Sequence, residues 1–394
     1  MLSRRDFLAS TAALAATAGI GGAHAAMGPN DKFDLLIKGG DVLDPSQSLR
    51  GRRDIGIRFG VVEAVEPEIA EARALRVINA SGKLVTPGLV DLHSHVYPYG
   101  SAIGIPADES VVNQCATTCV SAGDAGANNF AAFRRFIVGQ TRTRLYAFVH
   151  IAADIALGAK VRMSENIIAK HGTEPLKRAI LACEKSGTGA KIMCHIGGVE
   201  TGELMSQILD LLRPGDILTH AYSGFPNMAG AFTNIVQDGK LIPAALAAKQ
   251  RGVIFDVGHG GGSFDFTVAE VAIPGGCGPD TISSDLHAVS GNTPGMPYLP
   301  WVMSKFMVLG FTLEQVVAMA TINPAKIINR APKLGTLQIG APGDVAIMEL
   351  IEGPVSFVDT RNNRREGKAY LKPVQTVTGG VAFGRPYALP FAVR

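Results

Sequence analysis

The feature that most constrains the fold is a repeated pattern between about residues 86 and 332. Short apolar strands, each ending in a polar residue, recur there with helical patterns between them. Alternating strands and helices favour parallel strands joined by right-handed crossovers, and eight strands predict a closed (β/α)8 TIM barrel. The expected strands are Gly88–Asp91, Thr117–Ala122, Leu145–His150, Ala156–Val161, Lys191–His195, Ile217–His220, Val253–Val257 and Thr281–Ser284, and the clearest helices are Pro175–Ser186, Gly202–Leu212 and Pro243–Gln250.

Both sides of this region carry short alternating strands of another kind. Segments such as Leu35–Ile37 and Ile55–Ile57 precede it, and segments such as Asp344–Glu349 and Val374–Thr378 follow it. We therefore expect an α/β protein with a barrel over residues 87–332 and a small discontinuous β-sandwich domain built from residues 30–86 and 333–394. An open doubly wound sheet is the alternative, but the sequence has no Walker loop and no Gly-x-Gly-x-x-Gly motif opening a helix.

The composition limits the classes of function. The chain has 394 residues, 47% of them hydrophobic and 18% charged, with a formal charge of +3, which indicates a compact chain and no nucleic-acid partner. The five cysteines are an odd number on a large chain, so no disulfide framework is implied. Cys115 and Cys119 have the spacing of a metal or redox pair, but their segment of small residues favours buried packing.

The first residues have the pattern of an export signal. Twin arginines at Arg4 and Arg5 precede an apolar run rich in alanine, which ends at the small-x-small sequence Ala23-His-Ala25. Residues 1–25 therefore resemble a Tat-type signal peptide, which predicts a periplasmic or secreted protein. An uncleaved N-terminal anchor is the alternative. The apolar run is short for a bilayer, and no later segment is long enough, so we expect no stable membrane span.

Polar residues at the ends of the expected strands indicate the chemistry. His93 and His95 lie two residues apart in Leu89-Val-Asp-Leu-His-Ser-His95, so both imidazoles project to the same side of an extended backbone. In a barrel the carboxyl ends of all strands meet at one mouth. That mouth would also receive Lys160, His195, His220 and Asp285. These nitrogen and oxygen donors are numerous enough to bind two divalent ions.

The same residues carry a resemblance to a known family. The motif Pro87-Gly-Leu-Val-Asp-Leu-His-Ser-His95, the later histidines and the aspartate resemble the amidohydrolase superfamily. Within it, the segments Gly158–Ser164, Cys194–Gly197, Thr219–Gly224 and Phe255–Gly260 are most similar to the deacetylases related to dihydroorotase. This resemblance implies an enzyme acting on carbon–nitrogen bonds other than peptide bonds, with N-acyl amino acids or acyl hydroxy acids as substrates and an ester as a second type of scissile bond.

The resemblance also assigns roles to the residues. It implies that Lys160 is carboxylated by CO2 and that the resulting carbamate bridges two metal ions, with zinc the expected metal. The metal ligands would be His93, His95, Lys160, His195, His220 and Asp285. A hydroxide between the ions would attack the substrate carbonyl, and Asp285 would be the catalytic acid and base. The rival lysine, Lys191, begins its strand and would lie at the opposite rim.

Substrate contacts and partners are further expectations. Arg162 lies two residues beyond Lys160 and is expected to pair with a substrate carboxylate. Tyr222 and His259, which follow the expected sixth and seventh strands, are further candidates for substrate binding. His287, two residues beyond Asp285, is expected to bind substrate or to orient a ligand. The partner would be a small acyl substrate, and relatives of this kind often form homo-oligomers.

Three alternative functions remain open. One is hydrolysis of a cyclic amide or imide, as in dihydroorotase or hydantoinase. Another is a metal-free barrel that serves only as an interaction module, although the full set of donors argues against that. A serine esterase is suggested by His259-Gly-Gly-Gly262, but the sequence has no Gly-x-Ser-x-Gly elbow.

Overall fold

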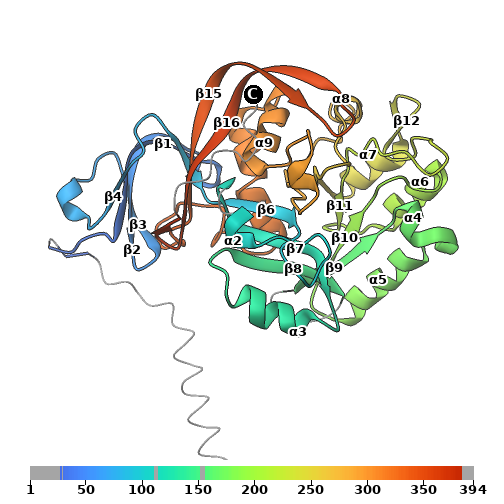
Figure 1. Cartoon of the computed structure of the whole chain (residues 1–394), viewed down its shortest axis with the longest axis horizontal. Helices are drawn as coiled ribbons and strands as arrows, with labels where there is room; N and C mark the ends of the chain where they lie inside the picture. The colour runs from blue at the N-terminus through green and yellow to red at the C-terminus, as the bar shows by residue number, and fades with distance from the viewer. Residues whose placement is uncertain (1–26, 29, 111–113, 151–155, 384–394) are drawn as a thin grey trace, which may run out of the picture.

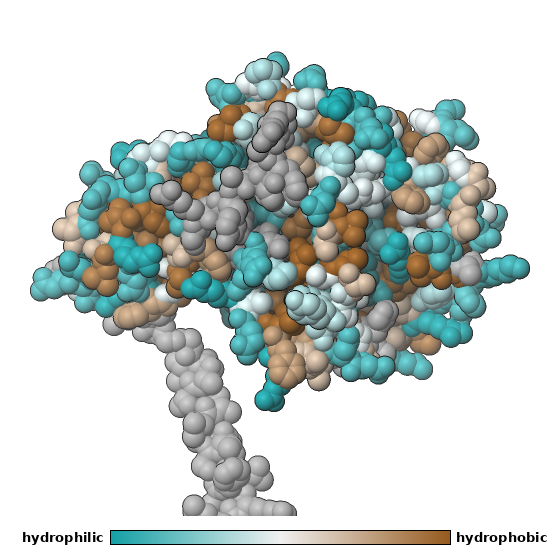
Figure 2. Space-filling model, in the orientation of Figure 1, coloured by the Kyte–Doolittle hydropathy of each residue, from teal (hydrophilic) through white to brown (hydrophobic). Residues whose placement is uncertain are grey.

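The computed structural model of the chain describes residues 27–383 apart from 29, 111–113 and 151–155. The export signal expected at residues 1–25 lies outside the described residues. Within them, a curled parallel sheet surrounded by helices lies beside a second, mixed sheet (Figure 1). Hydrophilic and hydrophobic residues are interspersed over the face drawn in Figure 2. No helix in the described part of the chain has the length and apolar character needed to cross a membrane.

Seven strands form the parallel sheet, and each pairs in parallel with its neighbours. In chain order, which is also their spatial order, they are β6 (Leu89–Ser94), β7 (Ala116–Gly126), β8 (Arg144–His150), β9 (Ala156–Arg162), β10 (Lys191–His195), β11 (Ile217–Thr219) and β14 (Ile254–Asp256). All seven correspond to strands expected from the sequence, because short runs of apolar residues buried on both faces are typical of a parallel sheet.

The segment 281–286 occupies the eighth position and closes the barrel. Thr281 forms a parallel bridge to Asp256 of β14, and Leu286 forms one to Ser94 of β6. Main-chain hydrogen bonds therefore run around the whole ring.

The expected strand Thr281–Ser284 is nevertheless not a regular strand, and this corrects the sequence-based expectation. At Ser284 a side chain replaces a main-chain partner, because the Asp91 carboxylate accepts the hydrogen bond of the Ser284 amide at 3.0 Å. Asp285 then adopts a left-handed backbone conformation with φ of 49°, which interrupts the extended backbone between the bridges at Thr281 and Leu286.

Helices cover the outside of the barrel, and their apolar faces pack against the strands. The helix α5 (Glu174–Lys185) differs by one residue at each end from the expected helix, and α7 (Pro243–Gln250) matches it. Thr201 caps α6 (Gly202–Leu211) by accepting a hydrogen bond from the Leu204 amide. The other helices are α2 (Ala107–Ser110), α3 (Phe130–Ala132), α4 (Glu165–Ile168), α8 (Phe266–Ala272), α9 (Leu299–Val308), α10 (Leu313–Met319) and α11 (Ile322–Ile327), and a small hairpin of β12 (Val236–Gln237) and β13 (Lys240–Leu241) lies between α6 and α7.

The strands alternate their side chains between helices and barrel interior, as β10 illustrates. Ile192 and Cys194 belong to the core between the barrel and its helices. Met193 belongs to a separate cluster inside the barrel, which α11 also contacts through Ala325. His195 shares the parity of Met193 and therefore faces the interior, at the end where the strand stops.

The second sheet contains strands from both ends of the chain. Its order is β17-β16-β15-β5-β1-β2-β3, with β4 paired to β1. Its members are β1 (Leu35–Asp44), β2 (Leu49–Arg58), β3 (Val61–Glu66), β4 (Val77–Asn79), β5 (Leu84–Pro87), β15 (Val345–Val358), β16 (Arg364–Thr378) and β17 (Val381–Ala382). The expected discontinuous β-module is thus present, but its described strands form one hydrogen-bonded sheet rather than two stacked sheets. Apolar side chains from both chain ends form its own core cluster.

The β15–β16 hairpin connects the second sheet to the barrel. Near its base β15 pairs with β5, and the hairpin then extends over the barrel (Figure 1). Phe357 and Tyr370, from its two strands, both contact the ring of Trp301 on α9. The hairpin is therefore part of the second sheet and also packs against the barrel.

The five cysteines are free and buried, as their surroundings in the sequence indicated. Burial raises the pKa of the Cys115 thiol to about 12 and that of the Cys194 thiol to about 12. These thiols are therefore not poised for nucleophilic or metal chemistry.

The close packing of β9 on β10 predicts the effect of a small substitution. A methyl group at Gly158 would overlap the main-chain carbonyl of Lys191, its register partner. We expect Gly158→Ala to lower the free energy of unfolding by about 3 kcal/mol, because the two strands would have to separate. Gly278→Ala, whose methyl group would have no contact closer than 3.7 Å, is the control and should change stability by less than about 0.5 kcal/mol. Thermal unfolding of both variants tests this, and equal stabilities would contradict it.

Candidate functional site

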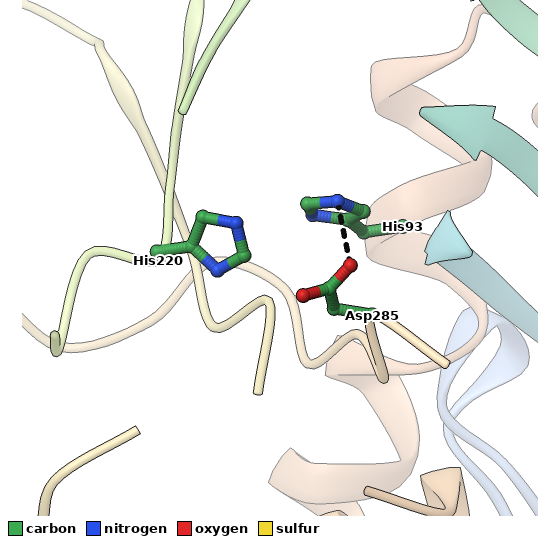
Figure 3. Close-up of side chains that lie close together, drawn as sticks. All are labelled: His93, His220 and Asp285. Carbon is green, nitrogen blue, oxygen red and sulfur yellow. Dashed lines mark ion pairs between the residues drawn. The ribbon is translucent and has the colours of Figure 1, made fainter. Parts of the chain in front are cut away.

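The six residues expected to bind metal lie together at the carboxyl end of the barrel strands. His93 and His95 lie at the end of β6, Lys160 in β9, His195 at the end of β10, His220 directly after β11 and Asp285 in the closing segment. Figure 3 shows His93, His220 and Asp285, which project toward one another from three different segments. One ligand atom from each of these three lies within 4.8 Å of the other two, and all three residues are buried.

Short contacts connect the six side chains. The Oδ1 atom of Asp285 lies 3.1 Å from His93 Nε2 and 3.2 Å from His95 Nε2. Lys160 Nζ lies 2.9 Å from the same His93 nitrogen. On the other side, His220 Nε2 and His195 Nδ1 are 2.9 Å apart. The rings of His93 and His220, with centroids 4.9 Å apart, bring the two groups together.

Two of these residues have a backbone conformation that L-residues rarely adopt. His220 has φ of 62° and Asp285 has φ of 49°, both in the left-handed region. Such a conformation costs of the order of 1 kcal/mol or more for a residue other than glycine, and it is concentrated at functional sites. At both positions the turn brings the side chain into the mouth, directly after β11 for His220 and within the closing segment 281–286 for Asp285.

A hydrogen-bonded relay fixes the tautomer of His93. Asp256, at the end of β14, accepts hydrogen bonds from the hydroxyls of Thr219 (2.7 Å), Thr281 (2.6 Å) and Ser283 (2.8 Å). Because the Thr219 hydroxyl donates to Asp256, its oxygen accepts from His93 Nδ1, 2.8 Å away. The proton of His93 is therefore on Nδ1, and the lone pair on Nε2 faces the centre of the site.

The histidines beside it are oriented by similar contacts. His95 Nδ1 lies 2.7 Å from Oδ1 of Asp124, so its Nε2 faces Asp285. His220 Nδ1 donates to the main-chain oxygen of Gly258 at 2.6 Å, which leaves Nε2 as its lone-pair atom. Together with the relay to His93, these contacts direct one nitrogen of each ring inward.

Burial determines the protonation states. It keeps the pKa of His93 and of His195 well below the ordinary value, and it lowers that of His220 to about 4. Burial alone would have the same effect on His95, but hydrogen bonds to Asp124 and Asp285 raise its pKa to about 9.

The pKa values of the carboxylate and the amine are shifted in complementary ways. Burial would raise the pKa of Asp285, but the histidines around it, His93 above all, hold it well below the ordinary value. Burial lowers the pKa of Lys160 to about 8.

The donor set fits a divalent cation. The site holds an ionised carboxylate and several buried imidazoles in their neutral form, which are the states that bind metal. The close approach of His195 Nδ1 to the lone-pair nitrogen of His220 brings two possible ligand atoms together. A cation between them would satisfy both nitrogens, so the part of the chain that the structure describes contains a candidate His/Asp metal site.

Arg162 lies beside this site and is exposed. In β9, Ala159 and Val161 pack against the helices, so Lys160 and Arg162 face the barrel interior. The guanidinium is close enough to lower the pKa of His195. Among the described residues it has no ion-pair partner, so it is available to an anion.

Tyr222 and His259 are not positioned to contact a substrate, in contrast to the sequence-based expectation. Both are fully buried. The Tyr222 hydroxyl donates to the main-chain oxygen of Cys277 at 2.8 Å. His259 contacts Lys305 through Nε2 and the Gly260 carbonyl through Nδ1, each at 2.8 Å. Their position after a strand correctly indicated the mouth of the barrel, but it could not show which way the side chains turn.

His287 lies at the edge of the site and is half-buried. Its ring meets that of His95 edge to face, with centroids 5.7 Å apart. Its Nδ1 accepts from the amides of Val289 and Ser290, each at 3.3 Å, so its proton is on Nε2.

Asp124 and Asp256, which orient the histidines, were not among the site residues expected from the sequence. Both are polar residues at or near the end of a barrel strand, the signal that identified the histidines themselves. Thr219 was overlooked because a threonine beside a histidine at a strand end has no distinctive pattern.

Comparison with known proteins agrees with this architecture. A model described as the Amidohydrolase family matches residues 275–382. The protein named Deacetylase Atu3266 of Agrobacterium fabrum is 31% identical over 366 residues, covering 84% of this chain and 87% of its own. A protein named Deacetylase of Brucella anthropi is 29% identical over 366 residues, covering 84% and 88%.

Solved structures give the same result. A structure described as a dihydroorotase has a TM-score of 0.79 and 29% identity, covering 90% of this chain and 99% of its own. One described as an adenine deaminase has a TM-score of 0.78 and 27% identity, covering 89% and 100%. These neighbours are TIM-barrel enzymes, which confirms the barrel expected from the sequence. The chain therefore belongs to the amidohydrolase family and is a hydrolase of carbon–nitrogen bonds other than peptide bonds.

Proposed function

We propose that this enzyme removes the acyl group from an N-acyl amino acid or an acyl hydroxy acid, with two divalent metal ions held by the six clustered residues. The observation that carries the proposal is the convergence of these donors, from segments far apart in the chain, beside the guanidinium of Arg162, which has no ion-pair partner among the described residues. The relatives named deacetylase support the reaction class. Zinc is the metal we expect, because imidazole and carboxylate ligands suit it.

Each group has a part in this proposal. His93, His95 and Asp285 would hold one ion, and His195 and His220 the other. Divalent ions there would supply a lowered pKa for water and polarisation of the substrate carbonyl. Near pH 8 a large fraction of buried Lys160 is neutral, the form that adds to CO2 with loss of a proton. The resulting carbamate would offer two oxygens to the ions.

Asp285 would transfer the proton. One of its oxygens faces His93 and His95, and the carboxyl is ionised at neutral pH because its pKa is held low. An ionised carboxylate can accept the proton of the attacking water and deliver it to the leaving amine or alkoxide. Arg162 would bind the carboxylate of the substrate through paired hydrogen bonds and so orient the scissile bond.

Hydrolysis of a cyclic amide or imide is the second candidate, favoured by the similarity to a structure described as a dihydroorotase. A screen of N-acyl amino acids, acyl hydroxy acids and cyclic imides separates the two, using zinc-loaded protein in bicarbonate buffer. Hydrolysis of cyclic imides alone would overturn the deacylase proposal. Activity that survives a chelator but is lost to a serine-directed phosphonate would overturn the metal mechanism. Export through residues 1–25 and a homo-oligomeric state remain proposals.

The relay to His93 predicts a change in metal affinity. Thr219→Val keeps the shape of the side chain but removes the hydroxyl between His93 and Asp256, so His93 Nε2 is no longer fixed as the lone-pair atom. We expect the affinity for zinc to fall about 10- to 100-fold. Competition with a chromophoric chelator measures it. Thr188→Val, in an exposed turn, is the control, and equal affinities of the two variants would contradict the relay.

The role of Asp285 predicts a loss of turnover without loss of metal. Asp285→Asn keeps a left-handed backbone accessible, because asparagine tolerates that conformation. We expect kcat to fall by about 1,000-fold or more while metal content stays close to that of the wild type. Asp238→Asn is matched, since Asp238 is exposed and also has φ of 49°. Activity close to wild type in metal-loaded Asp285→Asn would remove Asp285 from this role.

The role of Arg162 predicts a selective change in substrate binding. Arg162→Met should raise KM about 10- to 100-fold for a substrate with a free carboxylate, because a hydrogen-bonded charge pair is lost. The same variant should hardly affect an analogue whose carboxylate is amidated. Arg178→Met, an exposed helix position paired with Glu174, is the control. Equal effects on both substrates would show that Arg162 does not read the carboxylate.

A further inference from the structure

A fully buried lysine lies on α9, outside the metal site. Lys305 is 0% exposed, as are its helix neighbours Ser304 and Phe306. Lysine is almost never buried completely without compensation, because removing an ammonium group from water costs several kcal/mol. Burial lowers the pKa of Lys305 to about 7, while the negative charge of Asp359 raises it.

The ammonium group is saturated by three acceptors from three different segments of the chain. Lys305 Nζ lies 2.8 Å from His259 Nε2 and 2.7 Å from the main-chain oxygen of Val358, and it also donates to the main-chain oxygen of Gly295. An ammonium group has three N–H donors and no acceptor, so this set uses all of them. The acceptors come from the loop after β14, the loop after the closing segment, and the end of β15.

The contact with Lys305 fixes His259. Because Lys305 donates to Nε2, the proton of the ring is on Nδ1, which donates to the Gly260 carbonyl at 2.8 Å. The ring also stacks on Phe264, with centroids 5.0 Å apart and an interplanar angle of 25°. His259 is therefore held on both sides and restrains the peptide that follows it.

That peptide lies against the proposed acid and base. Gly260 has φ of 54°, and its amide donates to the Ser284 carbonyl at 2.9 Å. A methyl group at Gly260 would overlap Oδ2 of Asp285, the carboxylate oxygen that does not face the histidine nitrogens. The backbone at Gly260 thus forms the wall next to this oxygen.

The tip of the β15–β16 hairpin holds the same loop from outside. The Asp359 carboxylate accepts from the Phe266 amide at 2.8 Å, and the Thr360 amide donates to the Phe264 carbonyl at 3.1 Å. Arg361 donates to the Gly262 carbonyl. Lys305 therefore joins, at one buried point, the hairpin and the loop that borders Asp285.

We propose that Lys305 is a positioning residue that acts through His259 to hold the loop 258–264 against Asp285 and so sets the place of its free carboxylate oxygen. The effect on catalysis depends on the proposed function, whereas the effect on the loop does not. Lys305 touches no substrate in this arrangement. Its removal should therefore affect turnover more than substrate binding.

The experiment is a double-mutant cycle on the full chain. Lys305→Met removes the donors at similar volume, and His259→Phe keeps the ring on Phe264 but removes both nitrogens. We expect each variant to lower kcat about 10- to 100-fold, with KM within about threefold and metal content unchanged. The double variant should be within about twofold of the worse single variant, because both changes break one connection. Lys372→Met, an exposed lysine of β16 paired with Glu349, is the control and should behave as wild type.

Hydrogen exchange of the metal-free protein gives a readout that needs no activity. Amides of residues 258–264 should exchange faster in Lys305→Met, while those of β10 should not change. Unchanged exchange at 258–264, faster exchange everywhere, a wild-type kcat, or additive effects in the cycle would each overturn the proposal. If Lys305→Met does not fold, His259→Phe alone carries the same test. If the wild type neither binds metal nor hydrolyses an acyl substrate, the proposed function fails, and exchange still decides the role of Lys305.

Discussion

The constraint on which the site depends is the cost of burying many polar side chains in one place. Four imidazoles, a carboxylate and an amine meet at the barrel mouth, and burial pushes most of the imidazoles into the neutral form. Buried polar groups are tolerated only when they are hydrogen-bonded. The outer contacts from Asp256, Asp124 and the Gly258 carbonyl meet that requirement, and in doing so they decide which nitrogen of each ring faces inward. The same hydrogen bonds thus compensate for the burial of the rings and orient them as ligands.

Much of this arrangement could be predicted from the sequence because strand parity is local. Two polar residues that are two positions apart at the end of an apolar run lie on the same face of the strand, and both lie near its carboxyl end. The pairs His93 and His95, and Lys160 and Arg162, follow this rule. The eighth strand could not be predicted as it is. Its pairing depends on the Asp91 carboxylate, which lies 193 residues away, and on the left-handed turn at Asp285, which no local pattern announces.

The direction of a side chain that follows a strand end is the second feature that could not be predicted from the sequence. Tyr222 and His259 have the position of substrate-binding residues, yet tertiary partners take their polar atoms into the core. For His259 the partner is Lys305, 46 residues further along the chain, on a helix whose other residues are mostly apolar. A lone lysine in an apolar helix is usually drawn to the surface, so only the three-dimensional structure reveals that this one is enclosed by acceptors.

The β15–β16 hairpin connects the second sheet with the mouth of the barrel. At its base β15 pairs with β5, which leads directly into the barrel strand that carries His93 and His95. At its far end, Val358 accepts from Lys305, which holds the loop beside Asp285. One continuous strand therefore touches the scaffold of the ligands at one end and the wall of the site at the other. The second sheet thus contacts the surroundings of the site, through Val358 and Lys305, without contributing a ligand to it.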